Sequence, residues 1–366
     1  MSRLCAFSLP LLLLAALVAC SRRAVPVTPA TSADRIVLTD MLGQQLALSR
    51  PVQRVVTVPM PAGSLHMSLD HGPARLAGMH PNAYAQMRTG VLSRIYPAAQ
   101  AVRADITRSG FAPNVETLLG MRPDLVWQWG HLGDELIAPL REAGLPVAAL
   151  LYGEEARTVE WIRLMGQALG REAEASAQLA WRQQVRRELA SVCSTLTPAQ
   201  RPRVLYLARY WPQYRAAGQG TNFDDDVTLA GGHNVAGGLR GARNVSAEQI
   251  LAWAPDVIVL NTFEPDLLPR TVLDDPRLAD LPAVRSRRVY KAPNGGYRWD
   301  APNQESPLYW KWLAMQLHPR RFDWPLRAEI ARAYGQLYGY APTPADIDAV
   351  LQLDANREAA GYARFR

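Results

Sequence analysis

The chain has 366 residues, of which 48% are hydrophobic and 20% are charged, and it contains 25 glycines and 28 prolines. This composition is that of a globular protein and excludes a disordered or collagen-like chain. A single hydrophobic core usually stops growing at roughly 250–300 residues, so two lobes are expected rather than one. No apolar run approaches the roughly 20 residues that cross a bilayer, which excludes a polytopic membrane protein.

The formal net charge is +7, and Lys291 and Lys311 are the only lysines among the 40 basic residues. The arginines are scattered along the chain in singles and short pairs. Nucleic-acid-binding proteins tend to concentrate basic charge in one patch or helix. Nucleic acid is therefore not an expected partner.

The N-terminus has the pattern of a targeting segment. Arg3 supplies a positive start, and Leu9 to Ala19 form an apolar stretch too short for a membrane span, so residues 1–19 are expected to be a secretory signal. Leu17-Val18-Ala19-Cys20 resembles a bacterial lipobox, in which the cysteine is lipidated; an ordinary signal peptide with a chance cysteine is the alternative. We expect Cys20 to hold the protein on the cell envelope facing the periplasm, with residues 20–33, rich in Pro, Ser, Thr and Ala, as a flexible tether.

Residues 34–152 alternate between strand-like and helix-like segments. A β-branched run after Pro51 predicts a buried strand at 54–58, and further apolar runs predict strands at 125–127 and 145–150. Helical spacing lies between them. Strands alternating with helices favour βαβ units and a parallel sheet, so this region is expected to be one α/β lobe.

Residues 201–319 repeat the pattern, with strands expected at 203–207, 257–260 and 288–290. The segments VETLLGMRPDLVW and AEQILAWAPDVIVL match position by position: a glutamate, an apolar pair, Pro-Asp and an apolar strand. The proline ends each helix and fixes the entry into the strand. Two lobes built on the same unit are the simplest interpretation.

Two segments remain outside the predicted lobes. Residues 153–193 are expected to link the lobes. Almost no helix breaker occurs from Arg157 to Val192, but Gly166 and Gly170 interrupt the first part, so we predict one short helix followed by a long one from about Glu172 to Cys193 that limits the relative motion of the lobes. Residues 320–366 predict a helical extension, with helices at 326–338 and 344–351. We expect this extension to pack on the second lobe or to contact a partner.

With these segments in this order, the chain resembles the periplasmic substrate-binding proteins of iron-siderophore and cobalamin ABC importers. The motifs that support the resemblance lie at 51–56, 113–126, 231–236 and 246–259. The resemblance implies two Rossmann-like α/β lobes with central parallel sheets, one long α-helix joining them and a ligand cleft between them. It also implies a monomer that performs no catalysis and delivers its ligand to an ABC permease dimer with its ATPase.

Glu116 and Glu248 occupy equivalent positions in the two repeats. In the similar proteins, a glutamate at this place in each lobe meets arginines of the permease, and paired charges at an interface fix orientation and speed association. The alternative is that each glutamate only interacts favourably with the dipole at the start of a helix. We expect both residues to dock the permease.

Candidate ligand-binding residues follow the predicted strands, because ligands of open α/β sheets bind beyond the carboxyl ends of strands. Aromatic side chains with a few arginines suit a bulky ligand that bears charged oxygens. Some of these aromatic residues could instead belong to the core. The expected ligand-binding residues are Met60, Trp127, Trp129, Arg209, Tyr210, Tyr297, Arg298 and Trp299.

The predicted function is capture of a metal chelate, with no resident cofactor or metal. The basic charge favours an anionic ferric siderophore, while cobalamin and haem remain possible cargoes. A direct metal-ion or oxyanion carrier of the same fold and a non-transport sensory or scaffold lipoprotein are alternatives. No HxH or HxxxH pair is present, and an envelope enzyme is disfavoured because no GxSxG, P-loop or HExxH motif occurs.

Overall fold

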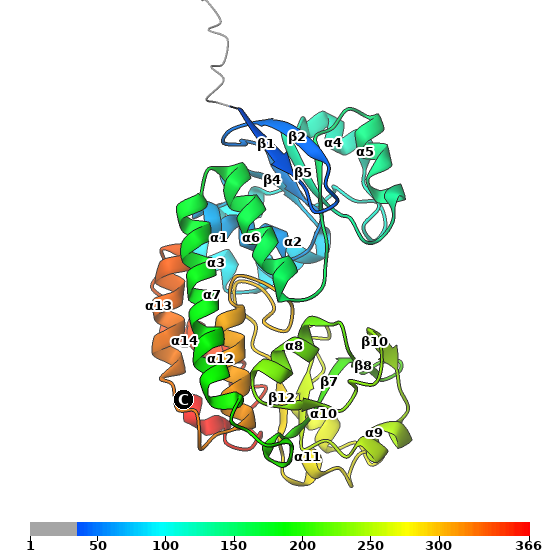
Figure 1. Cartoon of the computed structure of the whole chain (residues 1–366), viewed down its shortest axis with the longest axis vertical. Helices are drawn as coiled ribbons and strands as arrows, with labels where there is room; N and C mark the ends of the chain where they lie inside the picture. The colour runs from blue at the N-terminus through cyan, green and yellow to red at the C-terminus, as the bar shows by residue number, and fades with distance from the viewer. Residues whose placement is uncertain (1–34) are drawn as a thin grey trace, which may run out of the picture.

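The computed structural model describes residues 35–366. Two α/β lobes lie one above the other in Figure 1, and a layer of helices joins them along one side. This arrangement confirms the predicted fold class. The predicted signal peptide and the whole predicted tether, Cys20 included, lie outside the described residues.

The N-terminal lobe contains a four-stranded parallel sheet in the order β4-β3-β5-β6. Its strands are almost entirely buried, as expected for a parallel sheet covered on both faces. A separate antiparallel hairpin, β1 and β2, precedes it and was not predicted. The strands are β1 (Arg35–Thr39), β2 (Gln45–Ser49), β3 (Val55–Thr57), β4 (Leu76–Met79), β5 (Leu125–Trp129) and β6 (Val147–Leu150).

Five short α-helices accompany this sheet in the described chain. They are α1 (Ala62–Asp70), α2 (Pro81–Thr89), α3 (Leu92–Ile95), α4 (Val115–Met121) and α5 (Ala138–Glu142), with 3-10 turns at Pro97–Ala101 and Asp134–Leu136.

The C-terminal lobe has a six-stranded sheet in which β10-β8-β7-β11-β12 are neighbours and β9 pairs with β7. The pairs of β7, β11 and β12 are parallel, whereas β8 and β10 extend the sheet with antiparallel pairs that were not predicted. The strands are β7 (Arg203–Arg209), β8 (Arg215–Ala217), β9 (His233–Asn234), β10 (Ala242–Asn244), β11 (Val257–Leu260) and β12 (Val289–Lys291). The accompanying helices are α8 (Asn222–Leu229), α9 (Ala247–Trp253), α10 (Pro269–Leu273) and α11 (Pro282–Arg285), with a 3-10 turn at Pro198–Gln200 before the lobe.

The two repeats adopt the same local structure. At the start of each repeat's first strand, an arginine donates to the last carbonyl of the matching helix: Arg54 Nε to Met121 at 3.0 Å and Arg203 Nε to Trp253 at 3.1 Å. Each arginine satisfies a carbonyl oxygen that lacks an intrahelical partner. Helices α4 and α9 are therefore fixed to their sheets by equivalent contacts.

The ends of α4 and α9 also match. The helices begin at Asn114 and Ser246, whose side chains accept from the backbone N–H three residues later. They end at Arg122 and Ala254, both in the left-handed conformation with φ of 48° and 40°. The internal repeat seen in the sequence is therefore a repeat of the structure as well.

The linking segment forms α6 (Glu155–Leu169) and the long α7 (Glu172–Cys193), shown in green in Figure 1. Helix α7 contacts both lobes: Gln178 Nε2 donates to Ser68 Oγ at 3.2 Å, and Arg182 Nη1 donates to the Asn303 carbonyl at 2.6 Å. Arg182 is buried and also pairs with Glu155 of α6. Because a helix of 22 residues spans about 33 Å, α7 is a rigid connection between the lobes.

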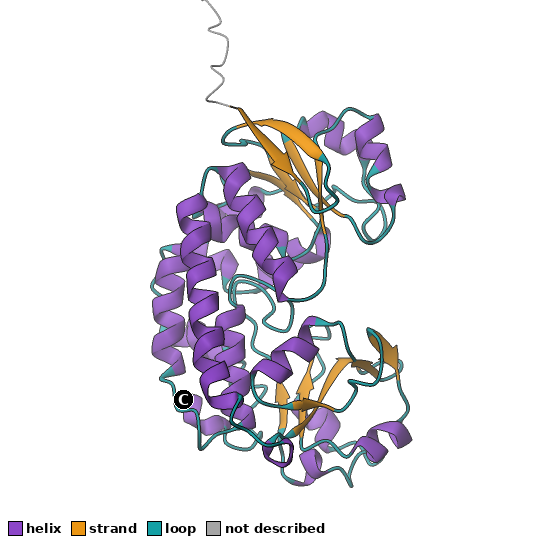
Figure 2. Ribbon diagram, viewed as in Figure 1, coloured by secondary structure: helices purple, strands orange, loops and turns teal. Residues whose placement is uncertain are grey.

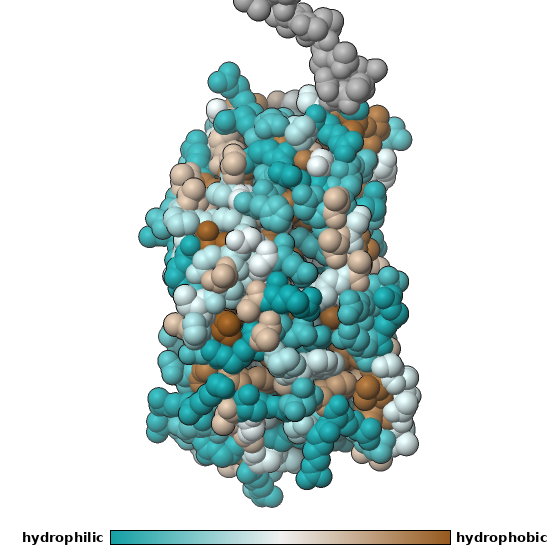
Figure 3. All heavy atoms as spheres, turned by 90° about the vertical axis from the view of Figure 1, so that its left-hand side faces the viewer, coloured by the Kyte–Doolittle hydropathy of each residue, from teal (hydrophilic) through white to brown (hydrophobic). Residues whose placement is uncertain are grey.

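The C-terminal segments are α12 (Ser306–Leu317), α13 (Leu326–Tyr338), α14 (Pro344–Val350) and a 3-10 turn at Tyr362–Phe365. Helix α12 packs against α7 and α13 packs against α12, so that the helices form a layer that connects the lobes (Figure 2). The surface on this side is predominantly hydrophilic, with apolar atoms in small scattered groups (Figure 3).

The extension beyond α12 contacts both lobes rather than the second lobe alone. On the N-terminal lobe, Arg94 pairs with Asp346 at 2.6 Å and the Tyr96 hydroxyl donates to the Tyr338 carbonyl at 3.1 Å. On the C-terminal lobe, the Tyr290 hydroxyl donates to the Ala360 carbonyl at 2.9 Å. The extension therefore restricts lobe movement together with α7. Among residues 35–366, no helix is both long and apolar enough to cross a bilayer.

Candidate functional site

A cavity of about 520 Å³ lies between the two lobes. Its volume is within the range of small-molecule binding sites. It is formed by residues at or just after the carboxyl ends of β3, β7, β11 and β12, by one face of α2 and by Gln352, as expected for ligand binding at the carboxyl ends of strands. The lining residues are Met60, Asn82, Ala85, Gln86, Thr89, Arg209, Thr262, Phe263, Pro265, Lys291, Asn294, Arg298 and Gln352.

Helix α2 supplies most of the wall from the N-terminal lobe. Asn82, Gln86 and Thr89 are spaced so that they share one face of the helix. The helix begins with Pro81 at its first position, and the His80 ring accepts from the Asn82 N–H at 3.1 Å. This N-terminal cap fixes the orientation of α2 and therefore which of its faces lines the cavity.

Two arginines and a phenylalanine form the opposite wall. The guanidinium carbon of Arg298 lies 4.6 Å from the centre of the Phe263 ring, and that of Arg209 lies 5.2 Å from it. The ring attracts both cations, which helps to hold two like charges near each other. Arg209 ends β7, Phe263 follows β11 and Arg298 follows β12, so three parallel strands bring the group together.

Neither arginine is neutralised by a carboxylate in the described part of the chain. Arg298 and Arg209 form no ion pair there, and Arg298 Nε is buried without a hydrogen-bond partner. The nearby Glu264 instead accepts from the backbone of Tyr210, and Asp300 accepts from the backbone of Thr262. The two guanidinium groups therefore give this wall a positive charge that no carboxylate of residues 35–366 balances by a direct ion pair.

Lys291 adds further positive charge beneath the arginines. It is 3% exposed, and its Nζ donates to the carbonyls of Asn261 and Glu264, both at 2.7 Å. Burial lowers the pKa of Lys291 from 10.5 to about 8, although nearby carboxylates partly oppose the shift. The ammonium group is therefore still mostly charged at neutral pH.

Buried Glu305 positions the loop that presents Arg298. Its carboxylate accepts from the Gly296 N–H at 2.8 Å and from the side chains of Trp299, Tyr334 and Tyr338. A Cβ on Gly296 would collide with the Tyr338 hydroxyl, which explains the glycine. Burial raises the pKa of Glu305, opposed by its hydrogen bonds. The loop shape thus depends on α13 of the C-terminal extension.

The lobes touch at the cavity itself. Gln86 Nε2 of α2 donates to Asn294 Oδ1 at 2.6 Å, a direct hydrogen bond between the lobes. Gln352 of the extension also lines the cavity and has a left-handed backbone with φ of 53°. This conformation is unusual for a residue with a side chain and is found disproportionately at functional sites. The cavity is thus assembled from both lobes and the extension.

The structure places the eight predicted ligand-binding residues in different surroundings. Met60, Arg209 and Arg298 line the cavity between the lobes. The five aromatic residues do not line it and are at most 5% exposed: Trp127, Trp129, Tyr210, Tyr297 and Trp299.

Tyr210, Tyr297 and Trp299 follow strands, as the prediction required, whereas Trp127 and Trp129 lie within β5. Most of the five contact the core of their own lobe. Trp129 packs edge-on against Phe111 and against His131, and Trp127 lies in the same core cluster. The Tyr210 hydroxyl donates to buried Asp275 at 2.6 Å. Trp299 is part of the Glu305 cluster.

Sequence reasoning missed most of the polar lining. Thr262 and Phe263 come two and three residues after a predicted strand, so the rule used for the other candidates would have found them. Lys291 ends the last strand in the same way. The residues of α2 were missed because β4, the strand before that helix, was not predicted. Gln352 has no signal in the sequence, since only the tertiary packing brings the extension to the cavity.

Helices α4 and α9 present the predicted docking residues to solvent. Glu116 and Glu248 each lie in the first turn, and both are exposed. Glu116 pairs with Arg108 at 2.6 Å, whereas Glu248 lies near Ser246. These contacts, together with the hydrogen bond to each glutamate's own backbone, lower both pKa values, so both carboxylates are charged at neutral pH.

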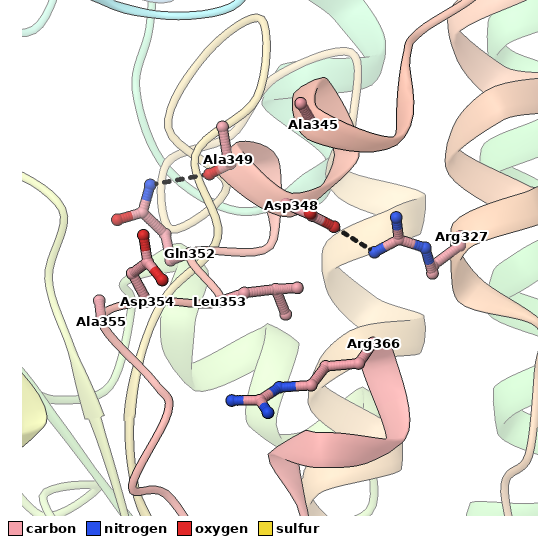
Figure 4. A pocket seen from close by; sticks show the side chains of 9 residues that line it. All are labelled: Arg327, Ala345, Asp348, Ala349, Gln352, Leu353, Asp354, Ala355 and Arg366. Carbon is pink, nitrogen blue, oxygen red and sulfur yellow. Dashed lines mark hydrogen bonds and ion pairs between the residues drawn. The ribbon is translucent and has the colours of Figure 1, made fainter.

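A larger cavity of about 710 Å³ lies within the C-terminal extension (Figure 4). Two arginines line it: Arg327 pairs with Asp348 at 2.6 Å, whereas Arg366 has no ion pair within residues 35–366, and Asp354 adds another negative charge. No residue of the N-terminal lobe lines it. The cavity between the lobes is the better candidate, because residues of both lobes line it and it lies at the carboxyl ends of their strands. In the described chain, no three His, Cys, Asp or Glu side chains are grouped to hold a metal ion.

Two lobes that enclose a polar cavity and are joined by a rigid helix define a solute-binding protein. A model of the periplasmic binding protein family matches residues 93–295, more than half of the chain, and the chain belongs to that family. It is the substrate-binding protein of an ABC importer, acts outside the cytoplasm with a permease and is not an enzyme. The resemblance stated from the sequence is confirmed.

Relatives and solved structures agree with this assignment. The chain is 25% identical over 315 residues to the molybdate-binding protein MolA of Haemophilus influenzae, covering 80% of this chain and 87% of that protein. It is 28% identical over 218 residues to a cobalamin-binding protein of Halobacterium salinarum, covering 54% and 56%. The crystal structure of a periplasmic solute-binding protein from Veillonella parvula has a TM-score of 0.79 and 28% identity, covering 88% and 98% of the two chains.

Proposed function

We propose that the cargo is an oxygen-rich, metal-containing anion held between the lobes by Arg209 and Arg298. The observation that supports this most directly is the pair of unneutralised guanidiniums on Phe263, one of which has a buried Nε without a partner. Guanidinium groups bind carboxylate and catecholate-type oxygens with paired hydrogen bonds. A cationic ligand would face the repulsion of both arginines and of Lys291.

An anionic ferric siderophore is the first candidate cargo. The cavity has the volume of more than ten waters, at about 30 Å³ each. A chelate can fill such a space and reach α2 on one side while its oxygens contact the arginines on the other. Haem and cobalamin are less well supported, because the cavity has only Phe263 as an aromatic wall.

A metal oxyanion is the second candidate. It is favoured by the similarity to the molybdate-binding protein, which extends over four-fifths of this chain. A tetrahedral oxyanion has only five heavy atoms, so water or lobe closure would have to fill the rest of the cavity. The amide side chains of Asn82, Gln86 and Asn294 could complete its hydrogen bonds.

Delivery of the cargo is proposed to use Glu116 and Glu248 as charged contacts with the two halves of the permease. Their equivalent positions on α4 and α9, with matching caps, support this role. We also propose that Cys20 is lipidated and anchors the protein to the envelope. Retention of palmitate label by wild type and its loss in Cys20→Ala would test the anchor.

Titration against a cargo panel tests the proposed function. The panel contains ferric catecholate and hydroxamate siderophores, haem, cobalamin, nickel–histidine, ferric ion alone and molybdate. With ten tryptophans in the chain, a coloured chelate should quench intrinsic fluorescence strongly. Colourless molybdate is followed by the rise in Tm, since a ligand at 100 times its Kd stabilises by about 2.7 kcal/mol.

The expected result is tight binding of an anionic ferric chelate. Binding of molybdate alone would assign the cargo to the oxyanion class instead. Binding of the free ferric ion but of no chelate or oxyanion, or no binding of any ligand in the panel, would contradict the proposal.

A further inference from the structure

Two exposed leucines occupy equivalent places in the two lobes. Leu119 of α4 is 45% exposed and Leu251 of α9 is 37% exposed. Each lies three residues after the proposed docking glutamate, so it shares a helix face with Glu116 or Glu248. A single exposed leucine is ordinary. However, only nine large apolar residues are exposed in the described chain, and two of these nine occupy the same position in the two copies of the repeat.

The helices leave these leucines no alternative role in the core. The preceding residues, Leu118 and Ile250, are fully buried and pack each helix onto its lobe. The matching caps and arginine contacts hold both helices in the same orientation on their sheets. The exposed leucines therefore lie on two helices that are fixed to their lobes in equivalent ways.

We propose that Leu119 and Leu251 are the apolar centres of a two-point docking surface whose partner presents the same surface twice. The proposal rests on the proposed docking role of the glutamates and names the additional contact. Figure 1 shows α4 and α9 at opposite ends of the molecule and on the side away from α7 and α13. A partner that reaches both must span the two lobes, which fits a permease made of two equivalent subunits.

The chemistry of each contact is an apolar anchor beside a charge. The carboxylate orients the partner through a basic residue, while the leucine is buried in a small apolar depression next to it. Both sites on the partner must be alike, because the helix, the charge and the apolar side chain are alike on this protein. The pair Arg108–Glu116 means that the partner's cation must share or displace Arg108 in one lobe.

The test replaces both leucines by serine and measures stimulation of the permease–ATPase complex in proteoliposomes. L119S/L251S is expected to raise the concentration needed for half-maximal stimulation at least about tenfold, since loss of each buried anchor costs on the order of 1 kcal/mol. Cargo affinity should be unchanged. The matched control is L132S/L268S, which changes one exposed leucine in each lobe outside these helices.

The outcomes separate this inference from the proposed function. If L119S/L251S stimulates like wild type while charge reversal at Glu116 and Glu248 abolishes stimulation, the leucine proposal is overturned and the docking role of the glutamates stands. If the control double variant loses stimulation equally, the effect is general and the proposal also fails. Full activity of both the leucine and the charge-reversal variants would overturn the docking role itself.

Discussion

Replacing Arg298 by glutamine is expected to weaken cargo binding by about 10- to 100-fold. Hydrogen bonds to charged groups contribute about 1.5–3 kcal/mol, and 1.4 kcal/mol corresponds to a factor of ten. The double variant R209Q/R298Q should lose on the order of a thousandfold or more, because it removes both guanidiniums from Phe263. Binding is measured by fluorescence quenching or by calorimetry with the best ligand of the panel.

Arg243→Gln is the matched control. Arg243 is an exposed arginine of the same lobe on β10 and does not line the cavity. It should bind cargo like wild type, which separates a local effect from a loss of net charge. The Tm of R298Q should stay within a few degrees of that of wild type, since the contact of Arg298 with Phe263 contributes only about 0.5–2 kcal/mol. Unchanged affinity in R209Q/R298Q would remove the arginines from the cargo site.

Reversing the charge of both docking glutamates, in E116R/E248R, is expected to abolish transport while leaving cargo affinity unchanged. Each substitution turns an attraction to a basic partner into a repulsion, and like charges across an interface cost several kcal/mol. Uptake of labelled cargo should fall below about one-tenth of the wild-type rate. The single variants should be intermediate, because the two lobes make equivalent contacts.

The control for charge reversal is E135R/D280R, which changes one exposed carboxylate in each lobe that does not belong to α4 or α9. Transport by this variant should remain near normal. A normal rate in E116R/E248R would instead favour a sensory or scaffold role for the protein, or docking through another surface. The amount of each variant in the cells must be matched to that of wild type, so that a folding defect is not mistaken for a loss of transport.

Local patterns were sufficient to predict most of the fold. The long helix was predicted from Glu172 to Cys193 and is found with those bounds. The repeat of Glu, apolar pair and Pro-Asp predicted α4 and α9 with the strands that follow them. These segments were predictable because their periodicity and their caps agree with their tertiary packing.

The site was less predictable because burial is not a local property. Trp129 ends a strand and Arg298 follows one, yet the tryptophan packs into its lobe while the arginine lines the cavity. The rule about strand ends locates a cavity but does not say which side chains turn inward. The contribution of Gln352 depends on the extension returning to both lobes, which no spacing in the sequence indicates.

The position of the bound metal is the most direct test of the account. Crystals of the protein grown with the best ligand of the panel should give one strong anomalous-difference peak in the cavity between the lobes. The ligand oxygens should lie within hydrogen-bonding distance of Arg209 and Arg298. A peak in the cavity of the C-terminal extension, beside Arg327, or a metal bound directly by protein side chains, would contradict it.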